Sequence, residues 1–211
     1  MEMRRAKSDG INVTCETCPH YFTLTDDDVR SYNTSMRVNP PLRTARDVDA
    51  IREGLADGTI DAIASDHAPH SLEEKQVEFD AAPPGMVGLE TLLPLTLTHL
   101  VKTGVVTMQR AVELTSRGPA SILGLPGGCI EKGAPADVTV VDTDILWTVT
   151  EEWLRSKSKN SPYLGHELTG RAVMTFSRGE IVFEDSDWKD RVRSNAQGVE
   201  AGERGHAPVR A

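Results

Sequence analysis

The chain has 211 residues, of which 38% are hydrophobic and 26% are charged, and its formal net charge at pH 7 is −9. This length and composition suit one or two globular domains with a sizeable core. The negative charge argues against nucleic acid or an acidic membrane surface as the main partner, but an anionic small substrate stays open, because a local metal ion or arginine outweighs a diffuse surface charge.

The cysteine content and the lack of long apolar runs bear on the compartment. Three cysteines provide no disulfide framework and are typical of a reducing environment. We find no signal peptide and no apolar run near about 18 residues, the length that a membrane span needs. We therefore expect a cytoplasmic protein.

The first elements alternate between helix and strand patterns. Residues 3–7 followed by Gly10 predict the end of a helix with a glycine C-cap, so the chain is expected to begin inside an element. Residues 11–15 alternate apolar and polar side chains and are rich in β-branched residues, which predicts a strand. Thr25 and the acidic residues 26–28 favour the start of a short helix.

A rigid loop and a second helix–strand pair follow. The two prolines of Asn39-Pro-Pro-Leu-Arg43 exclude both a helix and a central strand. Thr44 and Asp47 have the spacing of a capping box and predict a helix that ends at Gly58. The short apolar run 60–64 then predicts another strand.

The next stretch is predicted to be helical after a polar loop. Residues 71–80 are polar and predict the loop, and the apolar residues 89–101 predict a helix with a kink at Pro94. Residues 107–123 predict one or two further helices, broken at Gly118-Pro119.

From Gly127 onward the hydrophobic pattern changes to a period of two, which is typical of strands. Strands are predicted at 136–142, 171–176 and 181–183, joined by turn residues. The polar residues from 186 to 211 predict a disordered tail. The sequence therefore indicates an α/β part over 1–126, a small β part over 127–185 and the tail.

The predicted strand 60–64 ends in Ser65-Asp66-His67, with His70 three residues later. α/β folds bind ligands at the carboxyl ends of such strands. Asp66 must be solvated, hydrogen-bonded or bound to a cation, so a helix N-cap or an arginine partner is the alternative to a metal ligand. Carboxylate and imidazole suit zinc. His67 should face away from Asp66 in a structural role, whereas His70, after Pro69, is free to point at a ligand.

Other candidate positions carry weaker signals. Cys15 and Cys18 have CxxC spacing, but on a strand they project to opposite faces, which favours two buried hydrophobic side chains over a zinc or redox site. His20 fits either a polar role near the mouth of a site or a core position. Asn39 could bind the edge of an amide or imide, or be a turn asparagine. Gly85 allows a close backbone approach to a ligand, or makes a turn.

In combination, five segments resemble the carboxyl-terminal half of the dihydroorotases, which are cyclic amidohydrolases of the metal-dependent amidohydrolase superfamily. The resemblance covers residues 1–185 and rests on Cys-Glu-Thr-Cys-Pro-His-Tyr-Phe, Arg-Val-Asn-Pro-Pro-Leu-Arg, Asp-Gly-Thr-Ile-Asp-Ala-Ile-Ala-Ser-Asp-His-Ala-Pro-His, Pro-Pro-Gly-Met-Val-Gly-Leu-Glu-Thr and, over 128–142, Gly-Cys-Ile-Glu-Lys-Gly-Ala-Pro-Ala-Asp-Val-Thr-Val-Val-Asp.

The resemblance implies roles for the matching positions only. Asp66 matches an aspartate that ligates zinc, of which the intact enzyme holds one or two ions, and that moves the proton. Asn39 and His70 match residues that hold the ring and the carboxylate of the substrate, and Pro84 and Gly85 match a backbone contact to the ring. His20 matches no metal ligand of the family.

The resemblance also implies a fold. It predicts an α/β protein that holds the last two strand–helix units of a TIM-like (β/α)8 barrel, within 1–126, and part of a small β-sandwich domain, within 127–185. The family carries a His-x-His pair on its first barrel strand, and this sequence contains none. We therefore expect the chain alone to be inactive.

The implied reaction is the reversible, zinc-dependent hydrolysis of L-dihydroorotate to N-carbamoyl-L-aspartate in pyrimidine biosynthesis. An allantoinase or a hydantoinase is the alternative within the cyclic amidohydrolases. A non-catalytic, dihydroorotase-like subunit that supports aspartate transcarbamoylase is the alternative outside enzymes. A homodimer is a further expectation for partners.

Overall fold

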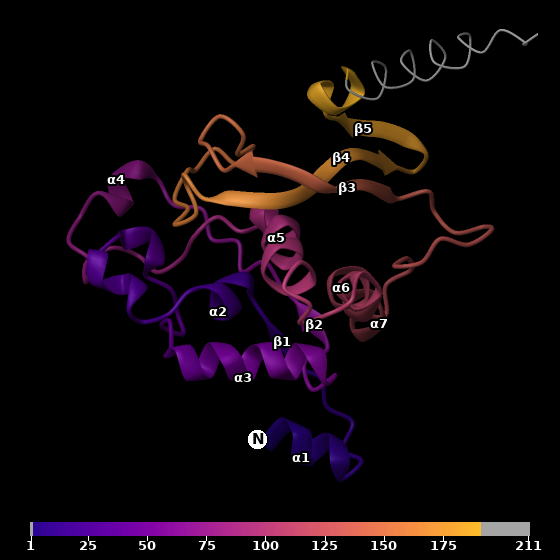
Figure 1. Cartoon of the computed structure of the whole chain (residues 1–211), viewed down its shortest axis with the longest axis horizontal. Coiled ribbons are helices and arrows are strands. Elements are labelled where there is room, and N and C mark those ends of the chain that lie inside the picture. Colours follow the sequence, from indigo (N-terminus) through magenta and orange to yellow (C-terminus); the bar gives the residue numbers. More distant parts are fainter. Residues whose placement is uncertain (1, 191–211) are drawn as a thin grey trace, which may run out of the picture.

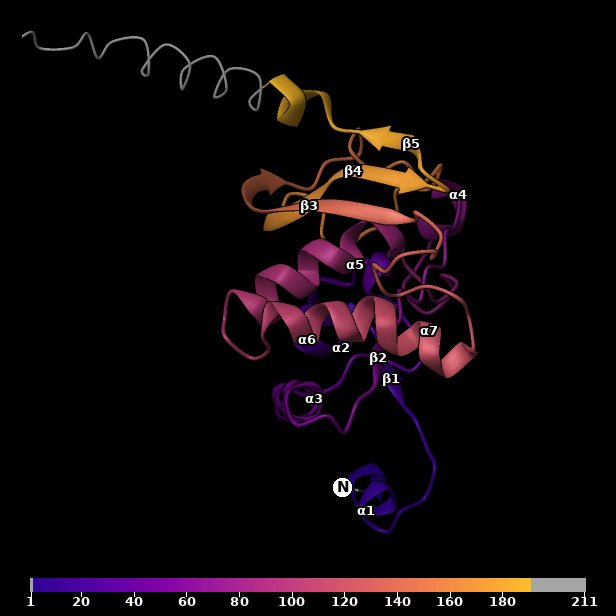
Figure 2. The same cartoon turned by 90° about the vertical axis from the view of Figure 1, so that its right-hand side faces the viewer.

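The computed structural model describes residues 2–190, and it arranges them in layers (Figures 1 and 2). A three-stranded sheet of β3 (Val138–Thr148), β4 (Glu167–Ser177) and β5 (Glu180–Glu184) forms one outer layer. Helix α5 (Leu89–Thr96) lies beneath this sheet, and the small β1–β2 sheet lies on the other side of the helical layer.

The β1–β2 sheet is one strand–helix–strand unit. Strands β1 (Glu16–Thr17) and β2 (Ala62–Ile63) pair in parallel, and α3 (Ala45–Ala56) connects them. The predicted strand at 11–15 is wrong in its bounds: backbone pairing with the β2 segment begins where the Cys15 carbonyl accepts from the Asp61 N–H. In the described chain the residues before Cys15 have no neighbouring strand, so their alternating pattern does not produce a ladder.

Short helices fill the connections around this unit. Helix α1 (Glu2–Ser8) ends before Gly10 as predicted, and Gly10 has a positive φ of 76°. The capping box of Thr44 and Asp47 opens α3 as predicted. Helix α2 (Pro19–Thr23) follows β1, and the short helix predicted after Thr25 is the 3₁₀ turn η1 (Asp28–Ser31), followed by η2 (Thr34–Met36).

The predicted polar loop 71–80 contains a helix that the sequence pattern did not lead us to expect. Helix α4 (Leu72–Lys75) begins at a capping box in which the Ser71 side chain accepts from the Glu74 N–H and the Glu74 carboxylate accepts from the Ser71 N–H. The Ser-x-x-Glu spacing was the available signal.

The helical layer continues through two π turns. Helix α5 passes into η3 (Leu97–Val101), and α6 (Met108–Val112), η4 (Glu113–Arg117) and α7 (Gly118–Leu123) follow one another without a gap. The predicted break at Gly118-Pro119 is therefore wrong. The Gly118 N–H reaches back five residues to the Glu113 carbonyl, and this wider turn accommodates the proline without ending the helix.

The three predicted strands of the β part are confirmed and are longer than expected. They form an antiparallel sheet in the order β3-β4-β5. A buried cluster joins this sheet to the rest of the chain, because some of its residues precede Gly127 and others belong to the β part. Its members are Leu24, Val38, Leu42, Met86, Leu95, Val149, Tyr163 and Leu168. A second cluster fills the space between α3, β2 and the helical layer: Phe22, Leu55, Ile60, Ile63, Leu100, Val106, Ala111 and Leu114.

Two sequence-based expectations concern the ends of the fold. Residues 186–190 form a helical turn, and the remainder of the predicted disordered tail, 191–211, lies outside the described residues. Within residues 2–190, no helix combines the length and apolar character needed to cross a membrane.

Candidate functional site

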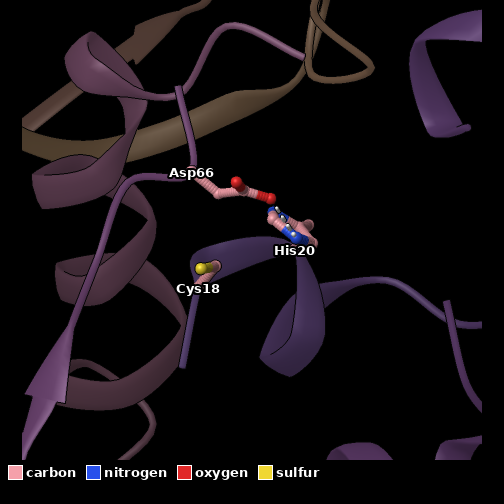
Figure 3. Close-up of side chains that lie close together, drawn as sticks. All are labelled: Cys18, His20 and Asp66. Atoms are coloured by element: carbon pink, nitrogen blue, oxygen red, sulfur yellow. Dashed lines mark ion pairs between the residues drawn. The ribbon is translucent and has the colours of Figure 1, made fainter. Parts of the chain in front are cut away.

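Asp66 follows β2 and turns its carboxylate toward α2 (Figure 3). Its backbone is in the left-handed region with φ 47°, a conformation that aspartate tolerates better than most residues. The side chain is 46% exposed, and its Oδ2 atom lies 3.6 Å from Nε2 of His20. The end of the strand thus presents a half-exposed carboxylate to a buried imidazole.

His20 is the buried partner in this pair. Only 1% of its surface is exposed, and its Nε2 atom has no hydrogen-bond partner. Burial lowers the pKa of His20 to about 4, and the nearby Asp66 charge opposes this shift only in part. The imidazole is therefore neutral at pH 7, as a metal ligand must be.

Cys18 completes a cluster with these two residues. It precedes α2, and one ligand atom from each of Cys18, His20 and Asp66 lies within 4.8 Å of the others. Burial raises the pKa of Cys18 to about 12, with further contributions from the charges of Asp66 and Glu16. Within the described residues, this is the one group of three such side chains that could hold a metal ion.

The chemistry of the cluster fits a divalent metal ion. Nitrogen, sulfur and carboxylate oxygen are the donors that zinc prefers in proteins. A buried imidazole nitrogen without a partner costs free energy unless a ligand satisfies it, and His20 holds such an atom. A bound cation would also favour the thiolate of Cys18, which burial and the neighbouring carboxylates otherwise oppose.

The two cysteines of the CxxC spacing have different surroundings. The Cys15 side chain is partly buried against the core cluster, less than the predicted full burial, and its Sγ atom lies 3.2 Å from the Thr59 carbonyl. Cys18 instead lies beside a carboxylate and an imidazole. The spacing alone could not distinguish the two positions.

His67 has a structural role, as predicted. Its Nδ1 atom accepts from the backbone N–H groups of Gly88 and Leu89, at 3.1 and 3.3 Å. These groups lie at the start of α5, where N–H groups lack partners inside the helix. His67 therefore caps a helix and takes no part in the Cys18, His20 and Asp66 cluster.

His70, Pro84 and Gly85 meet in a second part of the site. The Nε2 atom of His70 lies 3.1 Å from the Pro84 carbonyl, and its Nδ1 atom lies 3.5 Å from the Glu74 carboxylate. Gly85 has φ 138°, and a Cβ atom there would lie 2.5 Å from Cβ of Ala68 and 3.1 Å from Nε2 of His70. Glycine is thus the residue that lets these two loops approach.

Asn39 lies on a loop that is tied to the same region. The Arg37 carbonyl accepts from the Gly85 N–H at 2.7 Å, and the Arg37 guanidinium donates to the Ala82 carbonyl. Asn39 is exposed, and in the described part of the chain its amide has no hydrogen-bond partner. No hydrogen bond or ion pair within residues 2–190 joins Asp66 to Asn39 or His70, so the site consists of two groups.

Two features of this site could not be foreseen from the sequence pattern. Cys18 lies beside Asp66 because of how β1 and β2 pair, which the CxxC spacing does not reveal. The side chain of Asn160 bonds to the loops that carry His70 and Gly85. An isolated asparagine 90 residues away from His70 gives no local signal of such a contact.

Curated relatives share most of the described sequence. A dihydroorotase from Pelobacter propionicus is 56% identical over 181 residues, which cover 86% of this chain and 42% of that protein. A dihydroorotase from Geotalea daltonii is 57% identical over 180 residues, covering 85% and 42%. The chain therefore spans less than half the length of these relatives.

Solved structures and a family match lead to the same group of proteins. The L-hydantoinase from Arthrobacter aurescens superposes with a TM-score of 0.82 and 36% identity, over 87% of this chain and 42% of that protein. A dihydropyrimidinase from Brevibacillus agri superposes with a TM-score of 0.81 and 25% identity, over the same shares. Residues 2–182 match the amidohydrolase family. This chain belongs to the amidohydrolase family.

Proposed function

We propose that this chain supplies part of the active site of a dihydroorotase, which interconverts L-dihydroorotate and N-carbamoyl-L-aspartate in pyrimidine biosynthesis. The observation that carries the proposal is the 56% identity to a curated dihydroorotase over 181 residues that include Asp66, His70 and Gly85. We further propose that β1, α3, β2 and α5 are two units of a (β/α)8 barrel, whose catalytic groups lie at the carboxyl ends of its strands.

Asp66 would hold the metal ion and move a proton. One or two zinc ions, when bound, supply the Lewis acid that activates water and polarises the carbonyl group of the cyclic amide. The Asp66 carboxylate accepts a proton from the attacking water and returns it to the ring nitrogen as the carbon–nitrogen bond breaks. Its half-exposed position beside the unsatisfied Nε2 atom of His20 supports this role.

The second group would hold the substrate. The unpartnered amide of Asn39, within the described part of the chain, can pair with the donor and acceptor edge of the ring, and His70 would meet the carboxylate. The backbone of Pro84 and Gly85 would contact the ring, and the missing side chain at Gly85 lets this loop lie against Ala68 and His70.

A hydantoinase is the second candidate, because the solved structures that superpose well include hydantoinases and a dihydropyrimidinase. The substrates of the two candidate enzymes differ in one chemical group, a carboxylate, and His70 is the residue that would contact it. Neither hydantoin nor allantoin carries the carboxylate that dihydroorotate would present to His70.

The test uses a graft, in which this chain replaces the matching segment of the Pelobacter propionicus dihydroorotase. We expect the graft with zinc to hydrolyse L-dihydroorotate, and His70→Gln to raise its KM at least about tenfold, because a charged contact is worth about 1.5–3 kcal/mol. The matched change His166→Gln, on a histidine outside the site, should leave KM unchanged. Hydrolysis of hydantoin but not of dihydroorotate by the graft would overturn the proposal in favour of the second candidate.

The 211-residue chain alone should show no turnover of dihydroorotate with zinc, because it lacks a His-x-His pair. Turnover that Asp66→Ala abolishes would contradict this expectation.

A further inference from the structure

We propose that Asn160, in the connection between β3 and β4, is a positioning residue that sets the distance between the two loops that hold the substrate. The inference rests on the proposed function, since it concerns the loops of His70 and Gly85. Asn160 is 7% exposed, and the connection that carries it, residues 149–166, belongs to the β part of the chain and not to the strand–helix part that carries the site.

Both polar atoms of the Asn160 side-chain amide form hydrogen bonds. Its Nδ2 atom donates to the Ala68 carbonyl at 3.1 Å and to the Gly85 carbonyl at 3.2 Å, and its Oδ1 atom accepts from the His70 N–H at 3.2 Å. Its backbone carbonyl also accepts from the Val87 N–H at 3.1 Å. One residue thus joins both loops at four points.

These contacts lie at the positions where the substrate would be held. Gly85 has a single backbone N–H, which already donates to Arg37, and its carbonyl is the group that Asn160 holds. The His70 ring contacts the Pro84 carbonyl, so the ring and the backbone of this histidine are fixed from two directions. A shift of Asn160 would therefore move His70 relative to Gly85.

The connection that carries Asn160 is itself anchored, as a positioning residue requires. Tyr163 is 2% exposed, and its hydroxyl lies 2.7 Å from the Thr23 hydroxyl. Val149 and His166 close the base of the connection with a backbone hydrogen bond, and the Lys159 ammonium donates to the Leu154 carbonyl. Asn160 is thus held in place by groups that do not touch His70 or Gly85.

The decisive variant is Asn160→Asp, which keeps the shape of the side chain and replaces the donating Nδ2 by an acceptor that faces two carbonyl groups. Ser161→Ala is the matched control, because Ser161 is also buried and its hydroxyl accepts only from the Tyr163 N–H among the described residues, inside the same connection. Ser161→Ala therefore loosens the connection without removing a hydrogen bond to the site loops.

The first measurement is amide hydrogen exchange on the full 211-residue chain. We expect Asn160→Asp to speed the exchange of the His70 and Val87 N–H groups at least about tenfold relative to the Asp61 N–H, which bonds to the Cys15 carbonyl next to the β1–β2 sheet. Ser161→Ala should leave the exchange of His70 unchanged. Equal acceleration of exchange at all three N–H groups, or no acceleration at any of them, would overturn the positioning role. This measurement does not require the chain to be catalytically active.

The second measurement is steady-state kinetics of the graft. We expect Asn160→Asp to raise the KM for L-dihydroorotate about tenfold while kcat changes less than about threefold, because Asn160 bonds to Ala68, His70 and Gly85, whereas the Asp66 side chain pairs with His20. Ser161→Ala should leave KM unchanged. Equal losses in both variants, or a fall in kcat at constant KM, would overturn the proposal. An inactive unmodified graft would overturn the proposed function instead, and the exchange measurement would still decide the role of Asn160.

Discussion

At the scale of single residues, the site depends on backbone conformations and close approaches that few side chains allow. Asp66 has a positive φ of 47°, and Gly85 has φ 138° with the Ala68 side chain against it. A Cβ atom at Gly88 would overlap the Ser65 carbonyl oxygen. The glycine at this second position therefore lets the chain around Gly88 pack against Ser65, the residue before Asp66. These positions bring Asp66 and His70 to their partners.

Gly85→Ala should destabilise the fold and disturb His70. We expect the free energy of unfolding, measured by urea denaturation, to fall by about 2–3 kcal/mol, because the methyl group adds a clash to the unfavourable φ. Gly133→Ala is the control: Gly133 also has a positive φ, of 91°, but no atom lies within 4 Å of the position that the added methyl group would take. That variant should lose only about 1 kcal/mol. Equal losses would show that the contact with Ala68 and His70 contributes nothing.

The sequence indicated candidate site residues but not the residues that surround them. Asp66 could be found because it directly follows a buried apolar run, and Asn39 because two prolines hold it on a stiff loop. Cys18 and Asn160 could not, because their partners come from strands and loops that are distant in sequence. Local patterns specify which elements form, whereas such contacts follow from how the elements pack.

At the scale of elements, helices differ sharply in how strongly they are held to the rest of the fold, and α1 is held weakly. Helix α1 contains no buried residue and lies apart from the layers in Figures 1 and 2. Its contacts with the β1–β2 unit include ion pairs: Arg4 with Asp57 at 2.6 Å, and Lys7 with Asp61 at 2.6 Å. Partly exposed ion pairs of this kind contribute about 0.2–1 kcal/mol each.

The double variant Arg4→Ala, Lys7→Ala should therefore release α1. We expect a protease that cuts beside apolar residues to cleave within residues 9–14 about fivefold faster, because opening of this segment becomes more frequent. Arg5→Ala is the control, since Arg5 is 86% exposed and its ion pair is with Asp9, at the end of its own helix. Cleavage at the unmodified rate would contradict a tether made of ion pairs.

The π turn η3 carries a histidine whose environment links stability to pH. Burial, with the charges of Arg52 and His166, lowers the pKa of His99 below its ordinary value. Between that lowered pKa and about 6.5, the unfolded chain binds more protons than the folded chain, so stability falls as the pH falls through this window. We expect the unmodified chain to lose stability relative to His99→Gln from pH 7.5 to pH 5, measured by urea denaturation. Parallel pH curves for the two proteins would contradict this account.

Elements that a local sequence motif specifies could be predicted. Elements that depend on contacts with neighbouring segments could not. The capping box at Thr44 fixes the start of α3 whatever surrounds it. The strand predicted at 11–15 depended on a partner, and only Glu16 and Thr17 pair with β2. Pro119 was expected to end a helix, but the π turn η4 before it keeps the helical path continuous.

At the scale of the whole molecule, the site is held where the two parts of the chain meet. The buried cluster around Met86, Leu95 and Tyr163 joins the β part to the strand–helix part, and Asn160 adds directed hydrogen bonds at the same junction. The change from helical to alternating hydrophobic patterns after Gly127 allowed strands β3, β4 and β5 to be predicted. How the two parts dock could not be predicted, because the docking contacts join residues far apart in sequence.

The most direct test of the account is the turnover of L-dihydroorotate by the graft with Asp66→Asn. Asparagine keeps the size of the side chain but cannot accept and return a proton, so we expect kcat to fall at least about a thousandfold. Asp49→Asn, a change of the same kind on the exposed side of α3, should leave kcat unchanged. Zinc content is measured in both proteins. A graft that keeps its zinc and turns over dihydroorotate within about tenfold of the unmodified rate after Asp66→Asn would contradict the central claim.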